Sequence, residues 1–254
     1  MRDDTNCLAA SCLNQTNPAG TALLISAATL ALLSAPGLAL AGGFLPPAGV
    51  TAYRLAFITS DVTSAMSTLI GDYNTFATND ALASTLGLPS TAWHAIVSTA
   101  RVSALQNIGC GANCGAALPI YLVNGTTLVG TSITDLFGGT EPNTIRLDQN
   151  GVSFGSYVWT GSTAAGGIKT GNEVGAVSGN IEVGGPFFNA SLMFDLGGTF
   201  SNSGGGASTF PILAISSEID VPEPATGAAL LVAGLMITRV FRPKRQGHLG
   251  NVGK

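Results

Sequence analysis

The sequence predicts an α+β fold, a loop-rich body between two apolar segments, one at each end of the chain. Residues 21–35 and 225–241 are uncharged or nearly so and strongly apolar. Between them, a strand-like run leads into residues of helical periodicity, and short strand-like runs separated by turn residues follow. We therefore divide the chain into a leader region, residues 1–41, an α+β body, residues 42–220, and a C-terminal segment, residues 221–254.

The composition limits the kinds of partner. Charged residues are 9% of the chain, against about 25% in typical soluble domains. The apolar fraction of 46% is still enough for a packed core. Residues 42–224 contain four basic and twelve acidic residues, a net charge of −8. An acidic body repels phosphate backbones, which argues against nucleic acid as a partner.

The N-terminal apolar run has the pattern of a secretory signal. Residues 21–35 read TALLISAATLALLSA, and Pro36-Gly37 then breaks the helix. Ala39 and Ala41 supply the small residues that signal peptidase requires, with cleavage before Gly42. We therefore expect export of the body, with signal peptidase as a partner; the alternative is a buried core helix.

The C-terminal apolar run has the pattern of a membrane anchor. Residues 225–241 would span about 25 Å as a helix, close to a hydrocarbon core of about 30 Å. Basic residues near and after its end would act as a stop-transfer cluster: Arg239, Arg242, Lys244 and Arg245. Since basic flanks stay cytoplasmic, Pro224 and the body lie outside the inner membrane. The signal at the other end demands the same orientation.

The motif before this anchor resembles a known sorting signal. Val221-Pro222-Glu223-Pro224, followed by a short apolar helix and an Arg/Lys cluster, is similar to the PEP-CTERM domain. The resemblance implies cleavage near Pro224 by exosortase, transient anchoring in the inner membrane, and a place at the cell surface or in the extracellular matrix of a Gram-negative bacterium that makes extracellular polysaccharide. The alternative is an ordinary single-pass anchor that is never cut.

The first part of the body predicts a strand and two helices. Residues 53–59 (YRLAFIT) have strand composition. Asp61 is a suitable N-cap for a first helix, and Asn79-Asp80 for a short second one that ends at Gly87 and Pro89. Apolar residues follow helical spacing in the first of these: Val62, Met66, Leu69, Ile70, Tyr73, Phe76 and Ala77.

The second part of the body predicts short antiparallel strands. Residues 120–123 and 126–129 flank Asn124-Gly125, and Asn-Gly favours the tight turn of a hairpin. Residues 210–219 form the closing strand before the sorting motif.

This order of elements resembles the C-type-lectin-like fold. The likeness lies in residues 53–59, in residues 93–98 with Ala104 after them, and in residues 119–122 leading to Leu136. It implies that the first and last strands pair and bring the two ends of the body together. The disulfides of true C-type lectins are absent.

One tripeptide matches a sugar-binding motif of those lectins. It is Glu141-Pro142-Asn143, which makes Glu141 and Asn143 weak candidates for calcium-dependent sugar binding. The companion Trp-Asn-Asp is missing, because Trp159 is followed by Thr160 and Gly161. An exposed turn is the alternative role for the tripeptide.

Two cysteines remain in the body. Cys110 and Cys114 (CGANC) are candidates for a disulfide after export. Their spacing also occurs in metal sites, but no His or second cysteine pair lies next to them in the sequence, so no metal site is predicted. Free thiols are the other alternative.

The one candidate catalytic motif lacks the neighbouring elements that it requires. Gly151 to Gly155 (GVSFG) matches G-x-S-x-G, but that motif requires a following helix and a later histidine. A strand-like run follows instead, His94 precedes Ser153, and His248 lies beyond the anchor. No two carboxylates stand at a spacing that indicates acid–base work. We therefore predict no catalytic residue and no cofactor, with weak calcium binding left open.

These patterns together predict a non-enzymatic envelope or matrix protein. Its body would contact extracellular polysaccharide or another surface protein. Two alternatives remain open: a purely structural matrix component without a defined ligand, and a secreted hydrolase.

Overall fold

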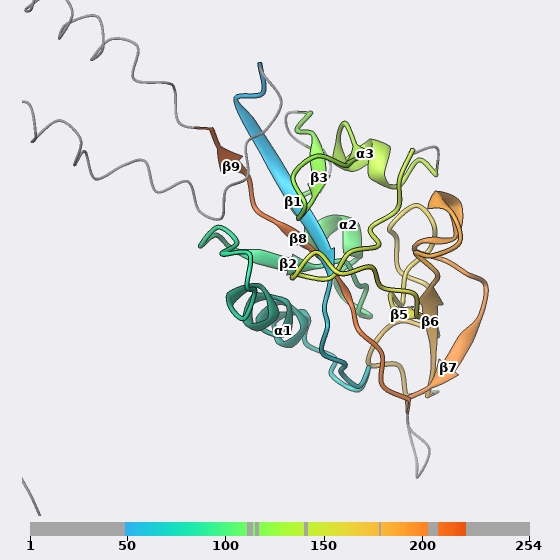
Figure 1. Cartoon of the computed structure of the whole chain (residues 1–254). Helices are drawn as coiled ribbons and strands as arrows, with labels where there is room; N and C mark the ends of the chain where they lie inside the picture. The colour runs from blue at the N-terminus through green and yellow to red at the C-terminus, as the bar shows by residue number, and fades with distance from the viewer. Residues whose placement is uncertain are drawn as a thin grey trace, which may run out of the picture. The chain divides into compact units, whose positions relative to one another are not determined.

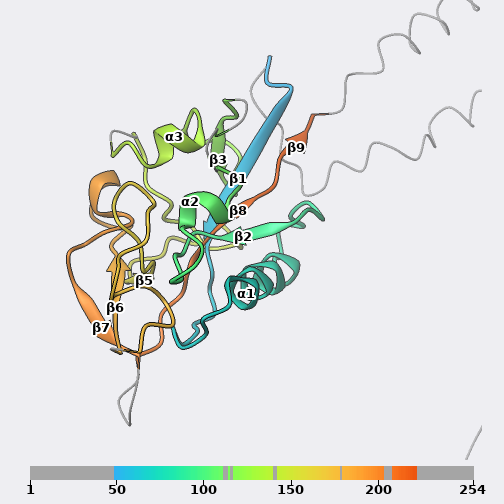
Figure 2. The same ribbon diagram turned by 180° about the vertical axis from the view of Figure 1, so that it is seen from behind.

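The computed structural model describes residues 49–110, 114, 117–139, 142–177, 179–202 and 208–221. They form a mixed α+β body (Figures 1 and 2), which confirms the predicted fold class. The strands are β1 (Ala52–Ile58), β2 (Trp93–Ala95), β3 (Ile120–Leu122), β4 (Leu128–Gly130), β5 (Val158–Trp159), β6 (Asn180–Gly184), β7 (Thr199–Ser201), β8 (Leu213–Ser216) and β9 (Ile219–Asp220). The helices are α1 (Ile70–Leu82), α2 (Ala104–Asn107) and α3 (Ile133–Leu136), with a 3-10 turn, η2 (Ala190–Leu192).

β1 is the centre of the larger sheet, whose order is β2-β8-β1-β3-β4. β3 runs parallel to β1, whereas β8 and β9 pair with β1 antiparallel. Every residue of β1 except Arg54 is buried. A strand buried on both faces needs cover on both faces, and this explains its continuous run of apolar residues.

Side chains that alternate along β1 enter two separate core clusters. Tyr53, Leu55 and Phe57 belong to one cluster, and Ala56 and Ile58 belong to the other. Successive side chains of a strand point to opposite faces, so the two clusters lie on opposite sides of the sheet. The first face carries α1, and the second carries α2 and α3.

α1 covers the first face with small and aromatic side chains. Tyr73, Ala77 and Ala81 are its buried apolar residues, at spacings of four. Beneath it, the rings of Phe57 and Trp93 pack edge to face with centroids 5.0 Å apart. Tyr73 and Ala77 of this stripe belong to the helical periodicity seen in the sequence.

The prediction of two N-terminal helices is wrong. A single helix, α1, begins at Ile70 and not after Asp61, and it runs through Asn79-Asp80 without a break. The segment before Ile70 is not helical because other elements bind its backbone. The carbonyl of Thr63 accepts a hydrogen bond from the indole Nε1 of Trp159 at 2.9 Å, and would otherwise serve the next helical turn.

Two short helices of one turn each, α2 and α3, cover the second face of the sheet. α2 begins with a capping box, in which the hydroxyl of Ser103 accepts the Gln106 N–H and the Gln106 side chain accepts the Ser103 N–H. α3 begins at Ser132, whose hydroxyl accepts the Asp135 N–H. Neither helix was predicted from the sequence.

The predicted hairpin is confirmed, but its connection is longer than a two-residue turn. β3 and β4 pair antiparallel, with residues 123–127 between them. Gly125 adopts a φ of 77°, which suits glycine. The Asn124 side-chain oxygen accepts the N–H groups of Thr126 and Thr127, each at 3.2 Å. Asn124 therefore fixes the turn through its side chain.

A second sheet, of order β5-β6-β7, is antiparallel throughout. Trp159 of β5 is fully buried and forms an isolated parallel bridge to Ile212, just before β8. Its indole also packs edge-on against Phe210, with centroids 4.9 Å apart. Trp159 therefore joins the smaller sheet to the segment that leads into β8 of the larger sheet.

The two ends of the described body lie side by side. β9 pairs with the beginning of β1, and the Val221 N–H donates to the Thr51 carbonyl at 2.8 Å. The pairing of first and last strands expected from the resemblance is thus present. None of the helices in the described ranges is long and apolar enough to cross a membrane. Both terminal apolar runs, residues 21–35 and 225–241, lie outside those ranges.

Candidate functional site

The loop that leaves β6 presents two adjacent phenylalanine rings to solvent. Phe187 is 39% exposed and Phe188 is 53% exposed, although most large apolar side chains of the described body are buried. The two rings lie 4.3 Å apart between centroids, and Tyr157 packs edge-on against Phe187 at 5.6 Å. The rings are therefore supported from within the body while they remain open to solvent.

Close backbone contacts at the base hold this loop in shape. Gly184 has no room for a Cβ, because the carbonyl group of Met193 occupies that space. The Gly185 N–H donates to the Leu192 carbonyl at 2.9 Å. At the far side, the Asn189 side chain caps η2 by accepting the Leu192 N–H at 3.1 Å. A loop bonded to itself in this way holds its side chains in one arrangement.

Residues 142–146 form the facing wall. Ile145 is fully buried, and its N–H lies 3.3 Å from the sulfur of Met193, which ties the wall to the loop. The Asn143 amide nitrogen donates to the backbone carbonyl at the start of β4 at 3.0 Å. Arg146 is exposed and forms no salt bridge with any described residue.

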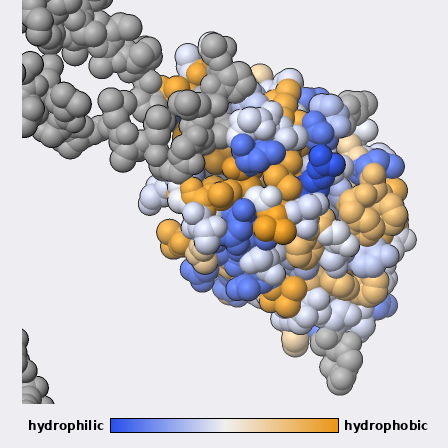
Figure 3. Space-filling model, in the orientation of Figure 1, coloured by the Kyte–Doolittle hydropathy of each residue, from blue (hydrophilic) through white to orange (hydrophobic). Residues whose placement is uncertain are grey.

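Between the loop and the wall lies a surface hollow of about 280 Å³, here called the phenylalanine hollow. It is lined by Pro142, Asn143, Thr144, Arg146, Phe187, Phe188, Asn189 and Ala190. The face seen in Figure 3 mixes hydrophilic and hydrophobic residues, with an apolar area toward the side of β6 and β7. Flat rings beside amide and guanidinium groups suit a ligand that has both C–H faces and hydroxyl groups.

The predicted site residues fall in different places. Asn143 lies in the phenylalanine hollow, whereas Glu141 is outside the described residues. Val221, the first residue of the sorting motif, is the last described residue. The other predicted residues of the two terminal signals are outside the described part: Ala39, Ala41, Pro222, Glu223, Pro224, Arg239, Arg242, Lys244 and Arg245.

The cysteine pair forms a disulfide in the structure. Cys110 and Cys114 are joined, with their Cα atoms 4.0 Å apart. Cys110 is fully buried and belongs to the core cluster beneath α2 and α3. The disulfide therefore fixes the chain where it leaves α2.

Ser153 of the G-x-S-x-G match does not sit on a nucleophile elbow. It is exposed and forms a β-bridge with Leu147, and the next element is the strand β5. His94 lies in β2, where its Nε2 is 3.2 Å from the Ser217 hydroxyl. Burial, and then the positive charge of Arg54, lower the pKa of His94. Ser153 of the motif thus takes part in backbone pairing.

The sequence showed no carboxylate spacing that indicates acid–base work, but two carboxyl groups distant in sequence lie together in the smaller sheet. Glu182 of β6 and Asp195 both accept the Gly197 N–H, at 2.9 and 3.1 Å. Lys169 reaches both, with its Nζ 2.9 Å from Asp195 and 3.9 Å from Glu182. Glu182 is only 2% exposed. A lysine beside one buried and one partly buried carboxyl group compensates their charge, so this cluster is an ion-pair network that joins β6 to the loops before and after it.

The two carboxyl groups of this cluster differ in acidity. Burial, and then the negative charge of Asp195, raise the pKa of Glu182 to about 7. Burial alone would raise the pKa of Asp195, but the hydrogen bond and charge of Lys169 lower it overall. Glu182 is therefore the member of the pair that takes up a proton first as the pH falls.

No cation site emerges in the described ranges, where no three His, Cys, Asp or Glu side chains are grouped to bind a metal ion. The sequence analysis also missed Phe187-Phe188. Its one available signal was a pair of consecutive aromatic residues between Pro186 and Asn189, in a segment with turn residues on both sides.

Comparison with known proteins adds no family to this description. No family model matches the chain, and no curated protein matches it.

Proposed function

We propose that this chain is an exported cell-envelope protein, sorted by exosortase, whose body binds extracellular polysaccharide through the phenylalanine hollow. The observation that carries the binding role is the exposed ring pair Phe187 and Phe188 beside Asn143 and Arg146. Exposed aromatic rings pack against the C–H faces of sugar rings, and amide and guanidinium groups bond the hydroxyl groups at the rim. The body acts as a binding module and not as an enzyme.

The sorting role rests on the residues that follow the body. The Val-Pro-Glu-Pro motif, the apolar run 225–241 and the basic cluster after it have the order of a PEP-CTERM signal. The pairing of β9 with β1 supports this role, because an anchor attached after Val221 would hold the body by one end. The same pairing supports a C-type-lectin-like arrangement of the body.

A glycan-binding measurement tests the binding role. The full chain in mild detergent is applied to an array of bacterial and plant polysaccharides, and the best ligand is titrated by calorimetry. Replacing Phe188 with Ala should weaken binding about tenfold or more, equivalent to about 1.4 kcal/mol. The matched control is Leu82→Ala, which removes another exposed apolar side chain, on α1.

Two outcomes would contradict the binding role. A blank array would favour the purely structural matrix protein, and equal affinity of the wild type and F188A would place any binding elsewhere.

Mass spectrometry of both protein termini tests the sorting role. In cells with exosortase, we expect a first residue of Gly42 and a last residue near Pro224. Without exosortase, the C-terminal segment should remain. Full-length, untrimmed protein in the cytosol would refute this role.

A further inference from the structure

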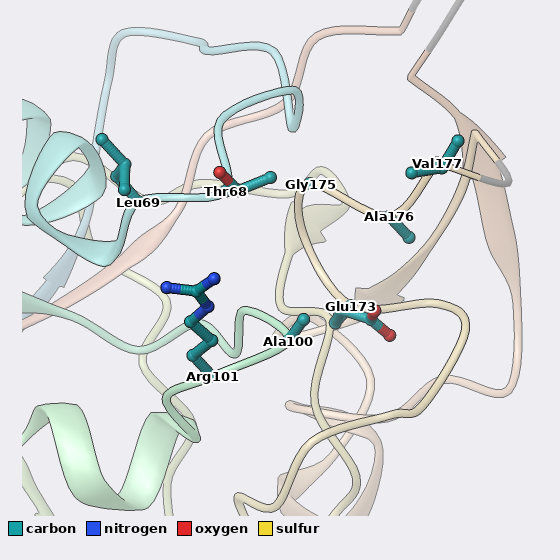
Figure 4. Close-up of a pocket in the computed structure, with 8 residues that line it drawn as sticks. All are labelled: Thr68, Leu69, Ala100, Arg101, Glu173, Gly175, Ala176 and Val177. Carbon is teal, nitrogen blue, oxygen red and sulfur yellow. The ribbon is translucent and has the colours of Figure 1, made fainter.

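A second hollow lies where three segments of the body meet (Figure 4). Its volume is about 420 Å³, which is within the range of small-molecule sites. It is lined by Thr68, Leu69, Ala100, Arg101, Glu173, Gly175, Ala176 and Val177. None of these residues lines the phenylalanine hollow, and the sequence analysis singled out only Leu69 among them, as part of a helix face.

The backbone around this hollow is held by direct hydrogen bonds and close contacts. The Val174 N–H donates to the Ser98 carbonyl at 2.9 Å, and the Gly175 N–H donates to the Ala65 carbonyl at 2.8 Å. A Cβ on Gly175 would lie 2.6 Å from the Ser67 carbonyl oxygen, so only glycine permits this approach. The walls are therefore fixed before any ligand binds.

The two charged residues that line the hollow, Arg101 and Glu173, do not form an ion pair with each other. Arg101 extends its guanidinium toward the space below Thr68 and Leu69, whereas the Glu173 carboxylate points away from it (Figure 4). Glu173 instead accepts the Gly171 N–H at 2.6 Å. Within the described ranges, Arg101 forms no salt bridge. The hollow therefore presents an available guanidinium.

The four basic residues of the body divide into two pairs. Arg54 donates to the carbonyls of Ile108 and Ser216, and Lys169 is ion-paired. The remaining two, Arg101 and Arg146, are exposed and without a salt bridge among the described residues, and each lines one of the two hollows. On a body with four basic and eleven acidic residues, a net charge of −7, the available cations thus coincide with the concave surfaces.

We propose that the hollow of Figure 4 is a second saccharide subsite, which selects a sugar unit bearing a carboxylate, such as a uronic acid. This inference rests on the proposed polysaccharide binding and names the ligand class as acidic. The Arg101 guanidinium holds the carboxylate through two parallel hydrogen bonds. Leu69, Ala176 and Val177 cover the C–H face of the ring, and Leu69 and Val177 are exposed for this contact.

The test compares two hexasaccharides that differ only in charge: hexagalacturonate and its methyl ester. Both are titrated into the full chain and into the variants R101Q, R101K and F188A. We expect the wild type to bind the acid at least tenfold more tightly than the ester, and less tightly as salt increases. R101Q should remove this preference while binding of the ester stays unchanged, and R101K should restore it only partly because lysine lacks the planar fork.

The outcomes separate this inference from the proposed function. If F188A weakens both ligands but R101Q weakens neither, polysaccharide binding stands and the acidic subsite is overturned. If neither hexasaccharide binds while another polysaccharide of the array does, the acidic subsite alone is overturned, whereas a blank array overturns both. A side-chain N–H resonance of Arg101 that shifts with galacturonate, and equally in F188A, supports the subsite by itself. A resonance that shifts only with a carboxylate-terminated peptide overturns it in favour of a peptide site.

Discussion

Replacing Glu182 with Gln tests whether the buried carboxyl pair makes the stability of the fold depend on pH. Glu182 is 2% exposed, and its pKa rises from the ordinary 4.5 to about 7 because of burial and of Asp195. The folded state therefore favours the protonated carboxyl. This contribution to stability is fully present below pH 4.5 and is lost as the pH rises through 7.

The size of the effect follows from the two pKa values of Glu182. The rise from 4.5 to about 7 corresponds to about 3 kcal/mol of unfolding free energy, at about 1.4 kcal/mol for each pKa unit. The pKa of Asp195 is lowered, so its own contribution changes only in acid, below the range that matters for Glu182. The glutamine side chain of the E182Q variant would remain neutral throughout and would still accept the Gly197 N–H.

Urea unfolding of the full chain, followed by tryptophan fluorescence, measures the difference. Trp93 and Trp159 are both buried and report on the two sheets. Between pH 5 and pH 8, the wild type should lose about 2–3 kcal/mol relative to E182Q, because a small part of the stabilisation is already lost at pH 5. The control E218Q changes an exposed carboxylate and should follow the wild-type profile. Parallel profiles for the wild type and E182Q would refute the reasoning.

Three further variants test other parts of the fold by urea unfolding. Gly184→Ala should destabilise the body by more than about 2 kcal/mol, because the added Cβ would meet the Met193 carbonyl. The control is Gly198→Ala, where an added Cβ meets nothing. Equal losses of unfolding free energy in the two variants would contradict the close contact. Trp159→Phe should cost about 2–4 kcal/mol through a cavity and the lost bond to Thr63; a loss below about 1 kcal/mol would show that the indole does not join the sheets. Cys110→Ser with Cys114→Ser should cost about 2 kcal/mol, and the wild type should gain two hydrogen atoms in mass on reduction; an unchanged mass would indicate free thiols.

Local patterns in the sequence predicted the central part of the fold. β1 was recognisable because a strand with both faces buried has an uninterrupted apolar run, and the β3–β4 hairpin because Asn124-Gly125 is a strong turn signal. The spacing of Tyr73 and Ala77, four positions apart on one side of a helix, indicated α1. In each case the cause of the structure lies within about a dozen consecutive residues.

The beginning of α1 was not predictable from the same periodicity. Val62 and Met66 continue the helical spacing, yet both are exposed in an extended segment. The competing interaction is a hydrogen bond from Trp159, almost a hundred residues later, to the Thr63 carbonyl. Tertiary contacts of this kind override local preference.

The candidate sites were even less accessible to sequence reasoning. Glu182 and Asp195 are thirteen positions apart, and their partner Lys169 precedes both. The walls of the phenylalanine hollow are separated by about forty residues, and Asn143 alone was recognised in advance, through a tripeptide match. Nothing in the spacing of these residues shows which loops of the smaller sheet meet.

The adjacency of Thr51 and Val221 has a mechanical consequence for a tethered molecule. If drag on a bound polymer pulls the body away from its C-terminal attachment, the tension enters through β9. Only two residue pairs hold β9 to β1, at Ala52–Asp220 and Tyr53–Ile219, and an antiparallel ribbon loaded at its end opens one pair at a time. A few residues of slack would therefore be released under low force, while β8, between β1 and β2, keeps the body folded.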